Sequence, residues 1–152
     1  MKKVAVSCDH AGFPLKDVVI GAVRECGFEP LDLGTDSTTS VDYPDFVAKA
    51  GRAVQSGEAW RAVVICGSGV GASIAANKMR GIYAGLCHDH YSAHQGVEHD
   101  DMNVLCLGAR IIGPAVVEEL VQAFLNAEFT AEERHSRRTG KIRAIEQQEL
   151  GR

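Results

Sequence analysis

The chain lacks a long hydrophobic segment, an excess of basic residues and any low-complexity linker. None of its apolar runs approaches the roughly 20 residues that a membrane-spanning helix requires. Met1 leads through two lysines into a strand-like segment, not into the apolar region of a secretory signal. The formal net charge of -4 argues against general nucleic-acid binding. These absences predict one cytoplasmic domain, residues 1–152, that acts on a small molecule and has no membrane or nucleic-acid partner.

The cysteines do not form the pattern that a disulfide framework or a structural zinc site needs. There are five, an odd number, and no two of them are arranged as Cys-x-x-Cys. We therefore expect reduced thiols. Cys8, Cys87 and Cys106 lie in or at the end of short apolar runs, where a cysteine usually packs as a small hydrophobic residue. Only Cys66 is followed directly by a glycine-rich loop.

Short apolar segments alternate with longer amphipathic segments along the chain. This alternation is typical of β-α-β units, and near-continuous apolar strands indicate a parallel sheet with helices on both faces. Strands are expected at residues 3–8, 29–33, 62–66, 82–87 and 103–107. Helices are expected at residues 14–26, 44–56, 72–79, 91–99 and 114–126, with a C-terminal helical arm at 130–152. The sequence thus predicts an α/β protein with three α/β/α layers and a five-stranded parallel sheet.

The segment from Val63 to Gly71 joins a buried strand to a loop with three glycines. Backbone N–H groups in such a loop, together with the start of the following helix, attract negative charge. Cys66 would place a thiol at the rim of this anion site, which suggests chemistry on an anionic substrate. The alternative is that Cys66 only packs at the end of its strand.

Other polar residues also follow predicted strands. Asp9 and His10 follow the first strand, His88 follows the fourth and Arg110 follows the fifth, while His99 stands shortly before the fifth. Because ligands gather at the carboxyl ends of parallel strands, we expect several of these side chains to share one edge of the sheet. The alternative is that they are ordinary solvated loop residues.

The C-terminal arm concentrates basic residues in an otherwise acidic chain. Arg134 and Arg138 are four residues apart and share a helix face, a spacing that allows two guanidinium groups to converge on one phosphate. The alternative is a solvated helix face with salt bridges to Glu132, Glu133 and Glu146. A terminal helix with this charge also suits contact with another subunit.

Several motifs, taken together and in order, resemble those of type B ribose-5-phosphate isomerases. The resemblance runs nearly from end to end of the chain. It rests on Cys66-Gly67-Ser68-Gly69-x-Gly71, Asp9-His10-Ala11-Gly12, Asp42-Tyr43-Pro44, Ala75-Ala76-Asn77-Lys78, His99-x-Asp101-x-Asn103-Val104-Leu105 and the pair Arg134 and Arg138. The family implies a Rossmann-like sheet and an aldose–ketose isomerase of the pentose phosphate pathway that uses no metal or cofactor. It also implies a homodimer, or a tetramer, whose active sites take residues from two subunits.

The resemblance further implies a role for each matching residue. Cys66 is the base that moves a proton between C1 and C2, and His99 protonates the ring oxygen during ring opening. The enediolate is held by Ser68 and by a nest made of Gly67, Gly69, Val70 and Gly71. Asp9 orients sugar hydroxyls and Tyr43 lines the pocket. The phosphate is bound by His10, Arg110, Arg134 and Arg138, with His99 and the two arm arginines expected from the partner subunit.

Two positions near these motifs refine the resemblance. Some relatives carry a glutamate base shortly after the glycine loop, but the corresponding residue here is Ala72, which places the chain in the cysteine-base group. Most relatives have asparagine after the ring-opening histidine, whereas this chain has Asp100. An ionised aspartate only accepts hydrogen bonds and repels a nearby phosphate. Asp100 therefore leads to the hypothesis that the pocket suits another sugar phosphate, such as a tetrose 4-phosphate, allose 6-phosphate or galactose 6-phosphate.

Three alternatives belong to other functional classes. Residues 67–72 formally match G-x-G-x-x-G/A with Asp89 further on, the pattern of a dinucleotide-binding oxidoreductase, although the intervening helix is short. A metal site would use His88, His90, His94 and His99. A phosphosugar-binding module would use the same anion site without turnover. A cysteine phosphatase is excluded because it needs arginine where Ala72 stands.

Overall fold

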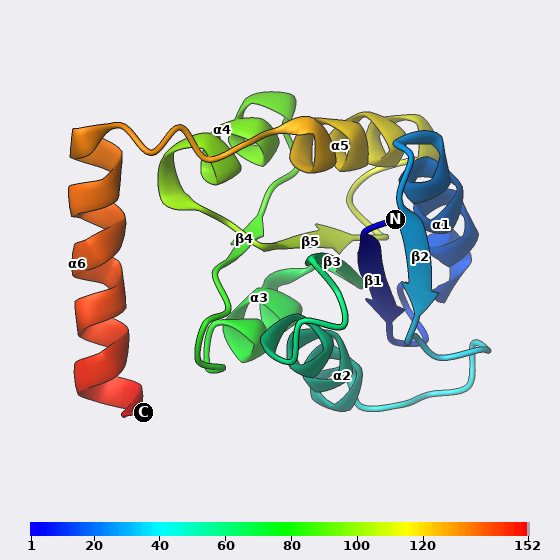
Figure 1. Cartoon of the computed structure of the whole chain (residues 1–152). Helices are drawn as coiled ribbons and strands as arrows, with labels where there is room; N and C mark the ends of the chain where they lie inside the picture. Colours follow the sequence, from blue (N-terminus) through cyan, green and yellow to red (C-terminus); the bar gives the residue numbers. More distant parts are fainter. Residues whose placement is uncertain (152) are drawn as a thin grey trace.

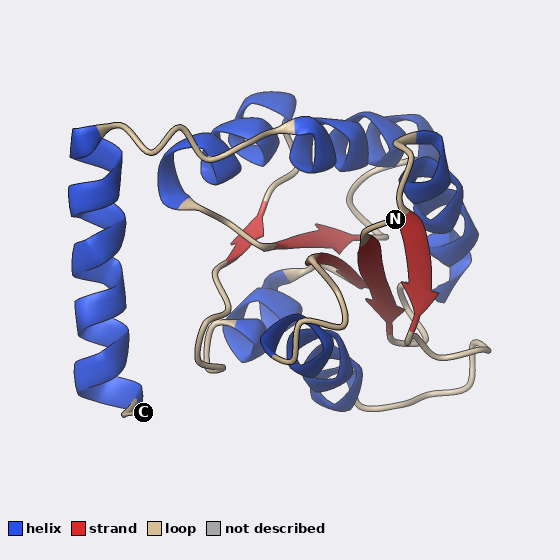
Figure 2. Cartoon of the chain, in the orientation of Figure 1, coloured by secondary structure: helices blue, strands red, loops and turns tan. Residues whose placement is uncertain are grey.

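The computed structural model describes residues 1–151 and shows a parallel sheet between two layers of helices (Figures 1 and 2). Five strands form the sheet in the order β2-β1-β3-β5-β4, and every neighbouring pair is parallel. The strands are β1 (Lys3–Cys8), β2 (Glu29–Asp32), β3 (Arg61–Cys66), β4 (Ala84–Leu86) and β5 (Val104–Gly108). The predicted α/β three-layer class with a five-stranded parallel sheet is confirmed.

The helices follow the predicted segments closely. They are α1 (Lys16–Glu25), α2 (Tyr43–Gln55), α3 (Val70–Ala76), α4 (His90–Asp100), α5 (Pro114–Asn126) and α6 (Glu133–Leu150), with a 3₁₀ turn at Phe13–Leu15 before α1. Pro44 and Pro114 stand in the first turns of α2 and α5, where a missing N–H leaves no intrahelical bond unmade. Within residues 1–151, no helix is both long and apolar enough to span a membrane.

The two sides of the sheet form two cores. On one face, Val63 and Ile65 pack with side chains of α1, α4 and α5. On the other face, Ala62, Val64 and Cys66 pack with side chains of α2 and α3. Successive residues of a strand point to opposite faces, so an uninterrupted apolar run supplies both cores. Cys66 therefore ends its strand on the α2–α3 side.

The strand β4 is shorter than the predicted segment 82–87. The backbone N–H of Tyr83 donates to Asn103 Oδ1 at 2.8 Å, and that of Ala84 donates to Asn77 Oδ1 at 2.8 Å. Side-chain oxygens thus accept from the backbone N–H groups at the start of this segment. Asn77 also donates to the carbonyl of Ala84 at 2.9 Å, just where α3 ends. The two asparagines define boundaries that apolar patterning alone does not reveal.

Arg61 is a buried cation that ties β3 to the end of α5. Its Nη1 donates to the carbonyl of Phe124 at 2.7 Å, and its Nη2 donates to the carbonyl of Ala127 at 3.0 Å. The guanidinium carbon lies 3.9 Å from the ring centroid of Trp60. Burial lowers the pKa of Arg61 to about 10, so the group stays charged at neutral pH. The carbonyls at the end of α5 are therefore satisfied by a side chain from the sheet.

Replacing Arg61 with methionine is expected to lower the free energy of unfolding by about 2–4 kcal/mol, because two buried carbonyls lose their donors. Urea denaturation measures this change. Arg52→Met is the matched control, since Arg52 is exposed on α2, and its effect should stay within about 0.5 kcal/mol. Equal destabilisation by the two substitutions would contradict the account of Arg61.

The helix α6 forms an arm that stands apart from the sheet (Figure 1). His135 and Thr139 are its buried residues. Arg143 pairs with Asp101 at 2.6 Å, and Glu146 accepts from the backbone N–H of Gly81 at 3.0 Å. The apolar side chains Ile142, Ile145 and Leu150 of the arm are exposed. The arm thus presents an apolar surface as well as its basic residues.

Candidate functional site

A cavity of about 620 Å³ opens at the carboxyl ends of β1, β3 and β5. In the sheet, β2 lies on one side of β1 and β3 lies on the other side. The strand order therefore reverses between β1 and β3, and this is the switch point where parallel sheets bind ligands. Nine predicted site residues line the cavity, namely Asp9, His10, Tyr43, Cys66, Gly67, Ser68, Val70, Gly71 and Arg110. The structure thus brings together the loops after β1 and β3 and one arginine after β5.

Cys66 lies at the floor of this cavity with only 6% of its surface exposed. The backbone N–H of Gly69 donates to its sulfur at 3.2 Å. The carbonyl of Cys66 accepts from the N–H of Ala109 at 2.8 Å, which anchors the end of β3 to the end of β5. An N–H donor suits a sulfur that carries negative charge. The thiol is therefore held in a fixed position and accepts a hydrogen bond from the backbone.

Two of the three glycines that follow Cys66 stand where the packing leaves no room for a side chain. Gly69 has a φ of 81°, in the left-handed region, and a methyl group there would lie 2.9 Å from the backbone carbon of Leu107. A methyl group at Gly71 would lie 2.5 Å from the ring of Tyr43. Tyr43 therefore packs against the first turn of α3, which brings its side chain to the cavity wall.

The loop after β1 holds two functional groups in fixed orientations. Asp9 is 7% exposed, and its Oδ1 accepts from the N–H of Gly12 at 2.9 Å. The Nδ1 of His10 accepts from the N–H of Val41 at 3.1 Å. A neutral imidazole that accepts through Nδ1 carries its proton on Nε2. The cavity is thus lined by a carboxylate and by an imidazole whose tautomer is set by the backbone.

Arg110 supplies the guanidinium group of this cavity. It is exposed, and it forms no ion pair with any side chain in the part of the chain described, residues 1–151. Its Nη1 lies 3.7 Å from where a methyl group at Gly67 would stand. The cation therefore lies over the glycine loop and remains available to an anion.

Three apolar residues that also line the cavity were not predicted, namely Ala11, Ile74 and Ile111. Ile74 and Ile111 are 60% and 59% exposed, an unusual position for large apolar side chains. Ala11 and Ile111 directly follow the predicted residues His10 and Arg110. Their positions next to these residues could have predicted that Ala11 and Ile111 line the cavity. No feature of the sequence predicts the same for Ile74.

Five other predicted residues do not line this cavity, namely Gly69, whose N–H faces the sulfur of Cys66, and four residues on α4 and α6. His99 and Asp100 stand at the end of α4, and Arg134 and Arg138 lie on α6. Asp100 lines a different cavity, of about 340 Å³. Arg134 pairs with Glu132. Arg138 is exposed and has no ion-pair partner among the residues described. Within one chain, the thiol and these four residues of α4 and α6 therefore do not form a single site.

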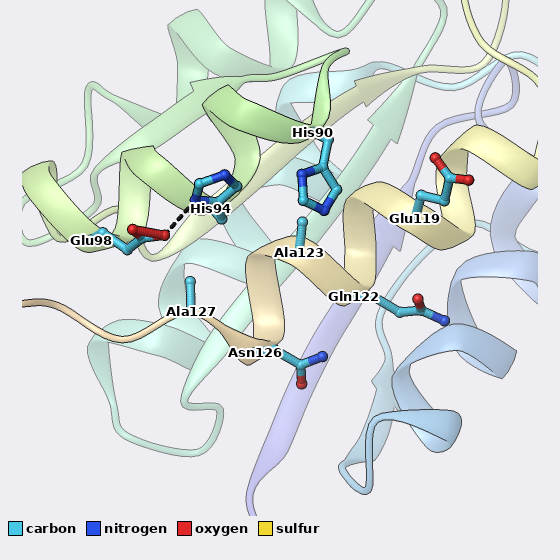
Figure 3. Close-up of a pocket in the computed structure, with 8 residues that line it drawn as sticks. All are labelled: His90, His94, Glu98, Glu119, Gln122, Ala123, Asn126 and Ala127. Carbon is cyan, nitrogen blue, oxygen red and sulfur yellow. Dashed lines mark hydrogen bonds and ion pairs between the residues drawn. The ribbon is translucent and has the colours of Figure 1, made fainter.

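The histidines of α4 do not converge as a metal site. His90 and His94 line a cavity of about 440 Å³ between α4 and α5, and His94 contacts Glu98 (Figure 3). His88 instead accepts from the N–H of Gly108 at 2.9 Å, and burial lowers its pKa. Across residues 1–151, no group of three or more His, Cys, Asp or Glu side chains is arranged to hold a metal ion. The absence of a metal in the reaction stays a prediction.

Three other cysteines, Cys8, Cys87 and Cys106, behave as packing residues. Cys8, Cys87 and Cys106 are all buried, at 0%, 7% and 0% exposure. Burial raises the pKa of both Cys8 and Cys87 to about 11, and it also raises the pKa of Cys106. These thiols stay protonated near neutral pH. The prediction that they pack in the core is confirmed, whereas Cys66 opens onto a cavity.

Asp89, which completes the formal dinucleotide pattern, has a structural role. Its Oδ1 accepts from the N–H of Ser92 at 2.7 Å and caps the start of α4. This hydrogen bond lowers the pKa of Asp89. The helix after the glycine loop, α3, has only 7 residues. Neither feature supports an oxidoreductase.

Comparison with known proteins identifies the family. Residues 4–142 match the model of the Ribose/Galactose Isomerase family. The chain is 44% identical to "Ribose-5-phosphate isomerase B" of Escherichia coli over 147 residues, covering 97% of this chain and 98% of that protein. The structure of type B ribose 5-phosphate isomerase from Trypanosoma brucei is similar, with a TM-score of 0.93 and 47% identity over 95% of this chain and 99% of that one. The corresponding structure from Trypanosoma cruzi has a TM-score of 0.95 and 43% identity over 97% and 98%.

The chain therefore belongs to the ribose/galactose isomerase family. The resemblance drawn from the sequence motifs is confirmed, and so is the predicted class, an isomerase of sugar phosphates.

Proposed function

We propose that this protein interconverts ribose 5-phosphate and ribulose 5-phosphate through an enediolate, with Cys66 as the base. The observation that carries the proposal is the sulfur of Cys66 at the floor of an open cavity, with the N–H of Gly69 at 3.2 Å. The names of the similar E. coli and Trypanosoma proteins point to the same substrate.

The chemistry follows from what lines the cavity. Moving a proton between C1 and C2 needs a base beside the carbon acid and donors for the oxyanion. The thiolate of Cys66 supplies the base, and the loop from Gly67 to Gly71 with the Ser68 hydroxyl supplies donors for the oxyanion. Asp9 orients the sugar hydroxyls. His10 and Arg110 bind the phosphate end, as their N–H groups suit an anion.

Two further steps need groups that lie outside the cavity. Ribose 5-phosphate is a closed ring and must be opened by protonation of its ring oxygen, which we assign to His99. Arg134 and Arg138 add charge for the phosphate. Because these residues lie on α4 and α6, away from the Cys66 cavity, we infer that a second copy of the chain supplies them. The exposed apolar side chains of α6 support such a homodimer. We also propose that the enzyme is cytoplasmic.

The substrate is tested by measuring kcat/KM for pentose, tetrose and hexose phosphates with the wild type and with Asp100→Asn. We expect ribose 5-phosphate to be the best substrate of the wild type. If Asp100 tunes the pocket toward another sugar, Asp100→Asn changes the relative kcat/KM values, and an unchanged ranking and ratio would contradict that role. Binding of sugar phosphates without turnover would refute the isomerase and favour a binding module.

The shared site predicts complementation between two inactive variants. Cys66→Ala and His99→Ala, mixed by co-expression at equal levels, form half of their dimers as mixed pairs, and each such pair has one intact site. Activity should therefore recover to about a quarter of the wild-type value. Steady-state assays of the purified mixture measure this recovery. Mixed dimers without activity would show that His99 and Cys66 act within one chain.

A further inference from the structure

The imidazole ring of His99 is held by two residues that neither the sequence motifs nor the proposed function assigns. Gln95, one turn earlier on α4, places its Nε2 2.8 Å from the Nδ1 of His99. The ring of His135, on α6, stacks on the ring of His99, with the two centroids 4.0 Å apart and an interplanar angle of 24°. One interaction fixes a ring nitrogen, and the other fixes the plane of the ring.

His135 is itself well anchored. It is 3% exposed, and its Nδ1 lies 2.6 Å from the Oγ1 of Thr130. Its carbonyl accepts from the Oγ1 of Thr139 at 3.0 Å. Burial lowers the pKa of His135, and the neighbouring His99 and Arg134 lower it further. A neutral, buried ring therefore forms the surface against which His99 packs.

We propose that Gln95 is a positioning residue that keeps the Nδ1 of His99 occupied in both protonation states, so that Nε2 is the nitrogen that exchanges a proton with the substrate. The inference rests on the proposed role of His99 in ring opening. A side-chain amide has both donors and an acceptor. Its carbonyl, after the amide turns, accepts from Nδ1–H both in the charged ring and in the neutral ring that remains once Nε2 has given up its proton.

The step served by this arrangement is ring opening. The C1–O4 bond of the furanose breaks, O4 receives the proton from Nε2 of His99, and the C1 hydroxyl loses its proton to solvent, which leaves the open aldehyde. Nothing is oxidised or reduced. A ring that turned about its side-chain bonds would present Nδ1 or a carbon instead. Loss of the Gln95 contact should therefore impair ring opening more than proton transfer at carbon.

Two reactions separate these steps. Net conversion of ribose 5-phosphate needs ring opening followed by proton transfer. Ribulose 5-phosphate has no free hydroxyl with which to close a furanose, so exchange of its C1 proton for deuterium in D₂O needs only the base and the enediolate. Coupled kinetics follow the first reaction, and proton NMR follows the second, with the same preparation of the full chain.

Gln95→Leu is expected to lower kcat/KM for net conversion at least about tenfold, because general acid catalysis contributes roughly 10²–10⁴-fold and is only partly lost. Deuterium exchange at C1 should stay within about twofold of the wild type. Gln95→Glu, which keeps an acceptor for Nδ1–H, should convert ribose 5-phosphate at least about threefold faster than Gln95→Leu. His94→Gln is the matched control on the same helix, since His94 contacts Glu98 and not His99, and it should leave both rates unchanged.

The outcomes separate this inference from the function on which it rests. Normal net conversion by Gln95→Leu, an equal fall in both reactions, or no advantage of Gln95→Glu over Gln95→Leu would each overturn the role of Gln95. His99→Ala is measured alongside, and full activity in that variant would overturn the role of His99 as well. A wild type without isomerase activity would refute the proposed function itself.

Discussion

Cys66→Ala and Cys66→Ser are both expected to lose isomerase activity by about 10²–10⁴-fold, because a general base contributes roughly that factor. The serine variant is the sharper test. Its hydroxyl is smaller than the thiol but occupies the same position beside the N–H of Gly69, and it does not ionise near neutral pH. The loss would therefore report the missing thiolate and not a collapsed loop. Coupled assays with ribose 5-phosphate give kcat, and thermal melting checks the fold.

Cys106→Ala is the matched control for the base. Cys106 lies on the neighbouring strand β5 in the same core as Cys66, and it does not line the cavity. Its removal should cost about 1 kcal/mol of stability and leave kcat nearly unchanged. Full activity in Cys66→Ser, or an equal loss in Cys106→Ala, would show that another group is the base.

Gly12→Ala is expected to destabilise the fold by about 3 kcal/mol or more, a large effect for one added methyl group. The methyl would lie 2.1 Å from the carbonyl oxygen of Ile65, an atom of the backbone that cannot turn aside. The same glycine donates its N–H to Asp9. The substitution should therefore separate the ends of β1 and β3 and lower activity as well. Denaturant unfolding measures the stability.

Gly21→Ala provides the opposite control. Gly21 lies inside α1, and a methyl group there would meet nothing within 4 Å. Alanine in a helix interior should stabilise the protein by about 0.5–1 kcal/mol. If Gly12→Ala were as harmless as Gly21→Ala, the close approach of Gly12 to β3 would not be a constraint on the fold.

Much of the fold could be predicted because buried parallel strands are nearly continuous apolar runs. The strands that supply Asp9 and Cys66 were placed at residues 3–8 and 62–66 and lie at Lys3–Cys8 and Arg61–Cys66. The predicted start of β4 was wrong by two residues, and at the observed start the N–H groups of Tyr83 and Ala84 donate to the side chains of Asn103 and Asn77. Such side-chain to backbone bonds depend on tertiary contacts that patterning does not encode.

The candidate site could be predicted where its residues directly follow a strand. Asp9, Cys66 and Arg110 share one cavity because the carboxyl ends of β1, β3 and β5 meet at one edge. Ile74 could not be predicted, since an exposed apolar residue on a short helix has no distinctive pattern. Gln95 could not be predicted either, because only the fold shows that its amide meets His99 and that His135 stacks on that ring.

The sheet around β3 and the helix α6 differ in the free energy that local opening costs. Strand β3 lies between β1 and β5, with partners on both sides for the residues before Cys66, so its amides open only when the whole sheet unfolds. Within a single chain, the helix α6 buries only His135 and Thr139, so it opens at much lower cost than the sheet once its contact with the second copy is broken. Under the proposed function, each opening removes Arg134 and Arg138 from the site while the thiol and its cavity stay intact. Heat should therefore inactivate the enzyme, reversibly, some degrees below the temperature at which the sheet melts.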